Sequence, residues 1–208
     1  MKFKITGSGQ SSGTRLTTAC PFCGHNGTFD KVDVNDMTDS NRNIYGQRKC
    51  PNPTCQGHVF FVKLIDGTFF TYPPRKIDFD KSNIPDNVLN AFEEAIVCHS
   101  NKCFIATAIM VRKTLEEICH HQGATGGNLK EKIKNLGTRI IVPKALIDGL
   151  DDLRLLGNDA AHIESQTFNQ VGHEETEISI QFTKEILKAV YQYEDLVMKL
   201  KSLKKPAS

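Results

Sequence analysis

The spacing of hydrophobic residues along the chain changes near residue 80. Before that point the strongest signal is two short runs of β-branched and aromatic residues, at 59–65 and 68–72. Asp66-Gly67 separates them, and Asp-Gly between two such runs is typical of the turn of a β-hairpin. Beyond residue 80 the hydrophobic residues recur with the period of an α-helix. The pattern therefore predicts an α+β protein, with a hairpin in its N-terminal part and helices in the rest.

The C-terminal part is predicted to form an all-α bundle. Helical periodicity, with proline and glycine near the ends of the segments, predicts helices over 85–98, 103–122, 129–136, from 143 to 154 and beyond, and 176–203. Pro73-Pro74 ends the N-terminal module, and the residues after it are typical of a linker. We therefore expect two domains, residues 1–80 with a compact module over 13–74, and residues 81–208.

Four of the seven cysteines stand in two pairs, Cys20/Cys23 and Cys50/Cys55, with the spacing C-x2-C and C-x4-C. Two such knuckles followed by a hairpin predict a zinc ribbon, because each knuckle supplies two ligands of a tetrahedral Zn²⁺ from one tight turn. A module this small buries little core, so the metal is expected to supply its folding free energy. Four protein ligands leave no open position for hydrolysis, so this zinc is predicted to be structural.

The ribbon has a second interpretation, as a surface that binds nucleic acid or a protein partner. Arg42, Arg48 and Lys49 lie beside the second knuckle and favour it. His25 and His58 lie just outside the knuckles and are the substitute ligands if one thiol is not used.

The three remaining cysteines, Cys98, Cys103 and Cys119, fall on or beside predicted helices. One interpretation is a second metal site, formed with the neighbouring histidines His99, His120 and His121. The interpretation that we favour is three core thiols, because free cysteine is among the most buried residue types.

Charge and hydropathy say little about the binding partners and the cellular compartment of the protein. The formal net charge is +2, and residues 1–80 hold ten Lys/Arg against seven Asp/Glu, so neither indicates a strong field for nucleic acid or membrane. The first ten residues lack a hydrophobic signal segment, and no later run approaches the length of a membrane span. We expect a cytoplasmic protein, because thiolate metal sites suit a reducing compartment.

The most unusual polar pattern is Arg154, Asn158 and His162, spaced i, i+4 and i+8. On a continuous helix these side chains lie one turn apart on one face. Gly157 costs about 1 kcal/mol in a helix interior, so the helix either ends there or approaches another backbone closely. The stripe has a structural interpretation as three satisfied polar groups, and a functional one as a site.

The helical part carries a resemblance. R-x-x-L-E at 112–116, L-R-x-x-G-N-x-A-A-H at 153–162 and a long closing helix resemble the bacterial domain-of-unknown-function family 4145, over about residues 84–203. That family is HEPN-like, often accompanies restriction and phage-defence proteins, and in similar proteins follows a zinc ribbon. The resemblance implies a bundle of helices, and many HEPN proteins are metal-independent endoribonucleases that dimerise so that two R-x4-6-H motifs face one cleft.

Carried onto this chain, the resemblance makes His162 the motif histidine and Asn158 the motif asparagine. The motif arginine stands just before the asparagine, where this chain has Gly157, so Arg154, one helical turn earlier, is the candidate. His162 would then be the general acid or base for attack by an RNA 2′-OH, and Arg154 would stabilise charge on the phosphate.

Asn158 would orient the histidine or the phosphate. Glu116 would hold Arg154 in place across two helices, in a pair that Arg112 could share. DNA would not be cut by this route, because it lacks the 2′-OH.

Two hypotheses follow. In the first, the chain is a HEPN-like RNA-directed effector in prokaryotic phage defence or restriction, a candidate endoribonuclease that forms a homodimer and works with a defence-system protein. In the second, it is a catalytically inactive module that binds nucleic acid or protein, and its polar stripe supports dimerisation.

Overall fold

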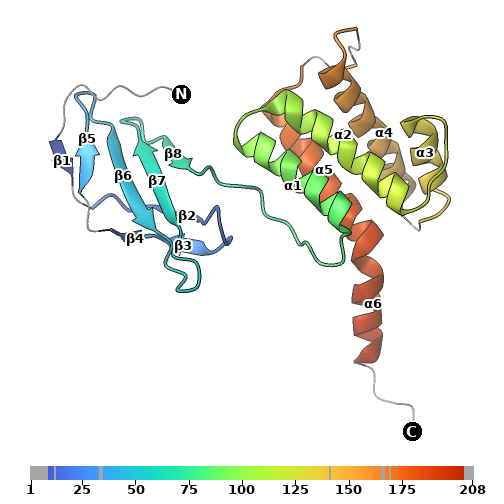
Figure 1. The fold of residues 1–208 in the computed structure, drawn as a ribbon, viewed down its shortest axis with the longest axis horizontal. Helices are drawn as coiled ribbons and strands as arrows, with labels where there is room; N and C mark the ends of the chain where they lie inside the picture. Colours follow the sequence, from blue (N-terminus) through green and yellow to red (C-terminus); the bar gives the residue numbers. More distant parts are fainter. Residues whose placement is uncertain are drawn as a thin grey trace. The chain divides into compact units, whose positions relative to one another are not determined.

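The computed structural model describes residues 9–11, 13–32, 35–140, 142–164, 167–168 and 170–203 of the chain. The chain divides into two compact units, Met1–Asp78 and Phe79–Ser208. Strands make up the first unit and helices the second, so the predicted α+β class is confirmed (Figure 1). Among the described residues, no helix combines the length and the hydrophobicity that a bilayer span requires.

All strand pairs of the first unit are antiparallel. The main sheet has the order β1-β5-β6-β7-β8, with β4 also pairing with β6, and β2 and β3 form a separate two-stranded sheet. The strands are β1 Gly9–Ser11, β2 Thr17–Ala19, β3 Asn26–Thr28, β4 Asp30–Lys31, β5 Asp36–Thr38, β6 Ile44–Lys49, β7 His58–Lys63 and β8 Phe69–Tyr72.

The predicted hairpin is confirmed as β7 and β8, in the register that pairs Lys63 with Phe69. Its turn depends on Gly67, whose φ of +89° suits glycine, and on the Asp66 carboxylate, which accepts a hydrogen bond from the Thr68 N–H at 2.8 Å. The central strand β6 lies in a stretch that the sequence pattern left as polar and unassigned. Its partners on both sides make it the middle of the sheet.

The main sheet has a buried face and a more open face, and on the open face Phe60 is exposed whereas Val62 is buried. Val59 and Phe61 point to the buried face, where they pack with Leu16, Phe29 and the knuckle cysteines. Arg48 points the same way and is only 2% exposed. Its two terminal nitrogens donate to the two Asp36 carboxylate oxygens at 2.7 and 2.6 Å. The prediction that Arg48 belongs to a partner-binding surface is therefore wrong, because the two-residue period of the strand turns it inward.

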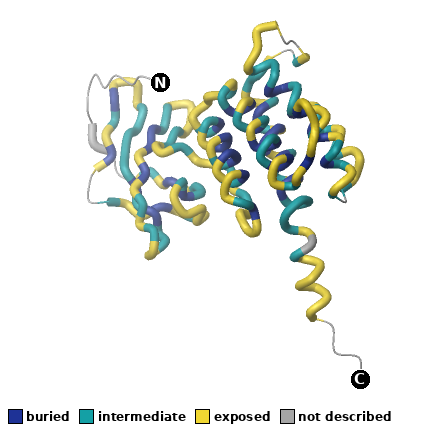
Figure 2. The backbone as a smooth tube through the Cα atoms, turned by 45° about the vertical axis from the view of Figure 1, so that its right-hand side comes forward, coloured by how far each residue is buried: buried dark blue, intermediate teal, exposed yellow. Residues whose placement is uncertain are grey.

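The second unit is a helical bundle. Its helices are α1 Asp86–Ser100, α2 Phe104–His121, α3 Leu129–Leu136, α4 Lys144–Ala161, α5 His173–Tyr191 and α6 Tyr193–Ser202. Helix α2 is central and packs against α1, α4, α5 and, less extensively, α3. The prediction of a single long helix over 176–203 is wrong in one respect, because the helix is interrupted at Gln192. Beyond that break, α6 is exposed along most of its length (Figure 2).

Gly157 lies inside α4 and does not end it, because the helix runs on to Ala161. A Cβ atom at Gly157 would stand 2.5 Å from the Arg112 Cβ and 3.2 Å from the Ala108 carbonyl oxygen, both on α2. The second of the two predicted interpretations, a close approach to another backbone, is therefore confirmed. The contact between α2 and α4 depends on the missing side chain.

We predict that Gly157→Ala lowers the free energy of unfolding by about 1–2 kcal/mol. Alanine gains about 1 kcal/mol of helix propensity, but overpacking costs about 1–3 kcal/mol, and here the groups in conflict are a Cβ and a main-chain oxygen that cannot move independently. Denaturant unfolding followed by circular dichroism measures the change. Gly127→Ala is the control, since its Cβ would meet only the Glu131 carboxylate at 3.4 Å. Equal stability of the two variants would contradict the assigned role of Gly157.

Candidate functional site

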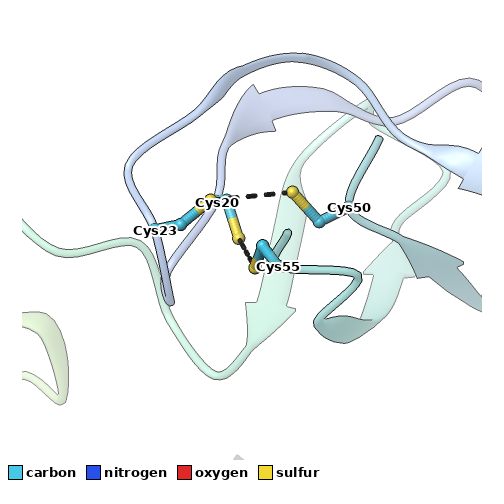
Figure 3. A group of neighbouring side chains, drawn as sticks. All are labelled: Cys20, Cys23, Cys50 and Cys55. Atoms are coloured by element: carbon cyan, nitrogen blue, oxygen red, sulfur yellow. Dashed lines mark hydrogen bonds between the residues drawn. The ribbon is translucent and has the colours of Figure 1, made fainter. Parts of the chain in front are cut away.

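The four predicted cysteine ligands come together in one cluster (Figure 3). Their sulfur atoms all lie within 4.8 Å of one another. The Sγ atoms of Cys20 and Cys55 are 3.8 Å apart, and those of Cys23 and Cys50 are also 3.8 Å apart. A disulfide needs a separation of about 2.05 Å, so these are free thiols rather than bridges. Four sulfur donors around one point could hold a metal ion.

Local main-chain hydrogen bonds shape the two knuckles. In the first, the Cys20 N–H donates to the His25 oxygen and the Gly24 N–H donates to the Cys20 oxygen, both at 2.9 Å. In the second, the Cys50 N–H donates to the Gly57 oxygen at 2.9 Å. Gly24 has a φ of +73°, a left-handed conformation that favours glycine. These turns bring both thiols of a knuckle to the same side of the backbone.

The surroundings of the thiols differ. A hydrogen bond from the His25 main chain is the main cause that lowers the pKa of Cys23 to about 7. Burial is the main cause that raises the pKa of Cys50 to about 12. The cluster thus combines an exposed thiol that ionises readily with a buried one that ionises only when a cation compensates its charge. The substitute ligands His25 and His58 are not part of the cluster, and the His58 ring is paired with the Gln47 amide.

The three residues of the predicted polar stripe lie at the C-terminal end of α4. Arg154 and Asn158 are on the helix, and His162 is the residue that caps it. The His162 N–H donates to the Asn158 oxygen at 2.9 Å, but the backbone of His162 is extended, with φ −132° and ψ 122°, so the helix itself ends at Ala161. His162 is exposed to solvent and not enclosed in the core. Asn158 is half-buried.

The predicted pair between Glu116 and Arg154 is wrong. Arg154 donates to the Asp151 carboxylate at 2.6 Å, and its side chain is 13% exposed. Glu116 instead accepts a hydrogen bond from Arg112 at 3.3 Å. Arg112 was the residue that could share the predicted pair. Each guanidinium thus finds its carboxylate three or four residues away on its own helix, where no second backbone has to be placed. The hydrogen bond from Arg154 is also the main cause that lowers the pKa of Asp151.

Arg154 and His162 are consequently held apart within one chain. Eight residues of helix correspond to about 12 Å along the axis. The guanidinium is bound to Asp151, which lies toward the N-terminal end of α4 and away from His162. Catalytic contacts require reacting atoms within about 3–3.5 Å of each other. The three residues therefore do not form a joint site in a single copy.

Asp159 was not among the predicted site residues. Its Oδ2 accepts hydrogen bonds from the Thr167 and Phe168 N–H groups, both at 2.6 Å. It thereby ties the connection that follows His162 back onto α4. The other carboxylate oxygen of Asp159, Oδ1, is buried and has no hydrogen-bond partner among the described residues.

The remaining cysteines do not form a second metal site among the described residues. Cys119 is buried, and burial raises its pKa to about 11, as expected of a core thiol. Cys98 is only half-buried and Cys103 is exposed, so the predicted core role is correct for Cys119 alone. Cys98 lies in the last turn of α1 and Cys103 immediately precedes α2. At such helix ends the helical periodicity does not determine which side chains are buried.

The open face of the main sheet carries an aromatic surface that sequence reasoning missed. Phe60 and Tyr72 are directly paired across β7 and β8 and are 56% and 43% exposed. The strand register places three further large side chains on this face, namely Met37, Tyr45 and Phe70. We call these five residues the aromatic face. The signal was present in the alternation of β7, where Phe60 and Phe61 necessarily point to opposite sides.

Comparison with known proteins identifies the helical unit. Residues 93–205 match the family described as Domain of unknown function (DUF4145), which is more than half of the 208 residues. No curated protein and no solved structure matches the chain. The match covers most of α1 and all of α2 to α6, including the stripe at the end of α4. On this basis the chain belongs to the DUF4145 family.

Proposed function

We propose that this protein binds single-stranded RNA through a zinc ribbon and that its helical unit is HEPN-like. The observation that carries the proposal is the exposed pair of aromatic side chains, Phe60 and Tyr72, on an otherwise ordered antiparallel sheet. Large apolar side chains left in the open on a small module point to a ligand, because burying them would otherwise stabilise the fold.

Stacking is the chemistry that this surface offers. Every base has an apolar π-face, and aromatic side chains on an open sheet stack successive bases of a single strand. Lys49 lies on the same face as Phe60 through the β6–β7 register. Its positive charge favours a phosphate backbone beside the stacked bases.

Zinc is the metal that the cysteine cluster fits best. Four sulfurs placed at about 2.3 Å around a tetrahedral zinc stand about 3.8 Å apart, and both measured pairs have that separation. The ion would hold the two knuckles together, and Cys20 and Cys50 are themselves part of the buried core of the unit. Its role in RNA binding would be to hold the strands that carry the aromatic face in position.

RNA cleavage is a second candidate function, favoured by the exposed imidazole of His162 beside Asn158. His162 would remove the proton from a 2′-OH, the 2′-oxygen would attack the adjacent phosphorus, and the bond to the 5′-oxygen would break as that oxygen takes the proton from His162. Because Arg154 lies about 12 Å from His162 along the axis of α4, the charge on the phosphate would be met by the arginine of a second copy. Phage defence and a defence-system partner remain part of this proposal.

We predict that the purified chain holds one tightly bound zinc, and that Cys50→Ser loses it. Elemental analysis gives the stoichiometry, and the near-ultraviolet signal of the aromatic residues reports the folding of the unit. Cys103→Ser is the matched control, since its exposed thiol lies outside the cluster. Removing zinc with a strong chelator is expected to unfold the ribbon. If Cys50→Ser held as much zinc as Cys103→Ser, the tetrathiolate site would be ruled out.

We predict that Phe60→Ala with Tyr72→Ala weakens binding of single-stranded RNA by roughly 5- to 150-fold for each stacked base lost, because a stack is worth about 1–3 kcal/mol. Fluorescence anisotropy with a labelled oligonucleotide measures the affinity at fixed salt. Ile65→Ala is the control, because it removes an exposed apolar side chain in the hairpin turn, beyond the paired strands. Unchanged affinity in the double variant would remove the aromatic face from consideration.

We predict that cleavage of mixed RNA by the zinc-loaded chain, without added divalent ions, stops in His162→Ala and continues in His120→Ala. His120 is also an exposed histidine, but it lies on α2. Products ending in a 2′,3′-cyclic phosphate, with DNA left intact, mark attack by the 2′-OH. If the wild-type chain does not cleave RNA, the helical unit is the catalytically inactive binding module.

A further inference from the structure

A second group of metal-ligating side chains lies in the helical unit, away from the cysteines. It consists of His99 in the last turn of α1, His173 at the first position of α5, and Glu177 one turn further along α5. Their ligand atoms all lie within 4.8 Å of one another. The fold thus brings together residues that are more than 70 positions apart in sequence.

The two ligands from α5 are already close to the spacing that a metal requires. His173 Nδ1 and Glu177 Oε2 are 3.5 Å apart. Nitrogen and oxygen ligands at about 2.0–2.1 Å around a tetrahedral zinc stand about 3.3–3.4 Å apart. Both side chains are about half-exposed, at 61% and 47%, so they can rotate enough to close the small difference between the two separations.

His99 supplies the observation that points to a ligand. It is only 9% exposed, and its Nε2 is buried without a hydrogen-bond partner in the part of the chain that the structure describes. A buried, unsatisfied polar atom costs about 1–3 kcal/mol. Burial lowers the pKa of His99, and His173 lowers it further. The imidazole is therefore neutral near pH 7 and presents a lone pair.

The surroundings suit a metal that is reached from one side. The Phe104 ring lies 6.0 Å from the His99 ring and 5.6 Å from the His173 ring, measured between centroids. It forms an apolar wall at the start of α2 beside both imidazoles. On the other side the exposed His173 and Glu177 leave a path from solvent. An apolar wall beside such ligands limits water around the ion and strengthens its bonds to the protein.

We propose that His99, His173 and Glu177 bind a divalent transition-metal ion such as Zn²⁺. Two imidazole nitrogens and one carboxylate are a ligand set that zinc uses when it keeps a fourth position for water or a substrate. The site therefore differs in kind from the tetrathiolate cluster, which has no open position. The ion would also join the C-terminal end of α1 to the N-terminal end of α5.

Calorimetric titration of the full chain, already carrying zinc at its cysteines, tests this proposal with Zn²⁺ as the probe. We expect one additional zinc per chain. His173→Ala and Glu177→Gln should each weaken this second binding event at least about tenfold, since even outer-shell changes cost 10- to 100-fold. Both residues are exposed, so neither variant should fail to fold, whereas His99→Ala alters the core. His120→Ala is the control and should keep the second event.

Co²⁺ offers an independent readout. Bound at the second site it should show visible d–d bands without the intense near-ultraviolet charge-transfer bands that thiolate ligands produce. Added zinc should also raise the melting temperature of the helical unit in the wild-type chain and not in His173→Ala. A chain that saturates at one zinc, or a second zinc that persists in both His173→Ala and Glu177→Gln, overturns the proposal. Neither result bears on the aromatic face or on the cysteine cluster.

Discussion

The sulfur atoms of Cys20, Cys23, Cys50 and Cys55 lie where they could hold one metal ion, and Cys20 and Cys50 are also part of the core of the N-terminal unit. Cys20 and Cys50 are buried with Val59, Phe61 and two other apolar residues, and this small group is the only buried hydrophobic cluster of that unit among the described residues. A core of that size cannot offset the conformational entropy of about 70 residues. The first knuckle follows β2 and the second follows β6, so a shared ion would tie the two-stranded sheet to the main one.

The residues that fill the buried face of the main sheet explain why its other face is open. Arg48 and Phe61 point inward together, with the guanidinium 4.8 Å from the centre of the ring, and Asp36 neutralises the charge. Removing either partner of such a buried pair costs about 3–5 kcal/mol, because the other charge is left unpaired. With the inward positions committed in this way, the two-residue period forces Phe60 and Tyr72 outward. The aromatic face is thus a consequence of how the buried face is filled.

Local patterns in the sequence predicted local structure well. The Asp66-Gly67 turn, the helix over 129–136 and each of the two cysteine pairs follow from residues close together in the chain. The strand β6 was not predicted, because Gly46 and Arg48 make its sequence polar. Only the ion pair with Asp36 explains a buried arginine there. Hydrophobic periodicity cannot detect a charge that is neutralised by a residue on another strand.

Side-chain partners in the helical unit could not be assigned from the sequence, because they depend on how the helices pack. Arg154 was given to Glu116 on α2, although Asp151 stood three residues away on the same helix. His99 was grouped with its sequence neighbours, whereas the fold places it beside His173 and Glu177.

The position of the Arg154 side chain also limits what the end of α4 can do. With the guanidinium bound to Asp151 and His162 about 12 Å further along the axis, one copy cannot place both groups on one phosphate. Two copies related by a twofold axis that crosses α4 would bring the arginine of each opposite the histidine of the other. Cleavage by this stripe would then depend on dimerisation, and its rate would fall more steeply than the protein concentration on dilution. RNA binding by the aromatic face carries no such dependence, so dilution separates the two activities.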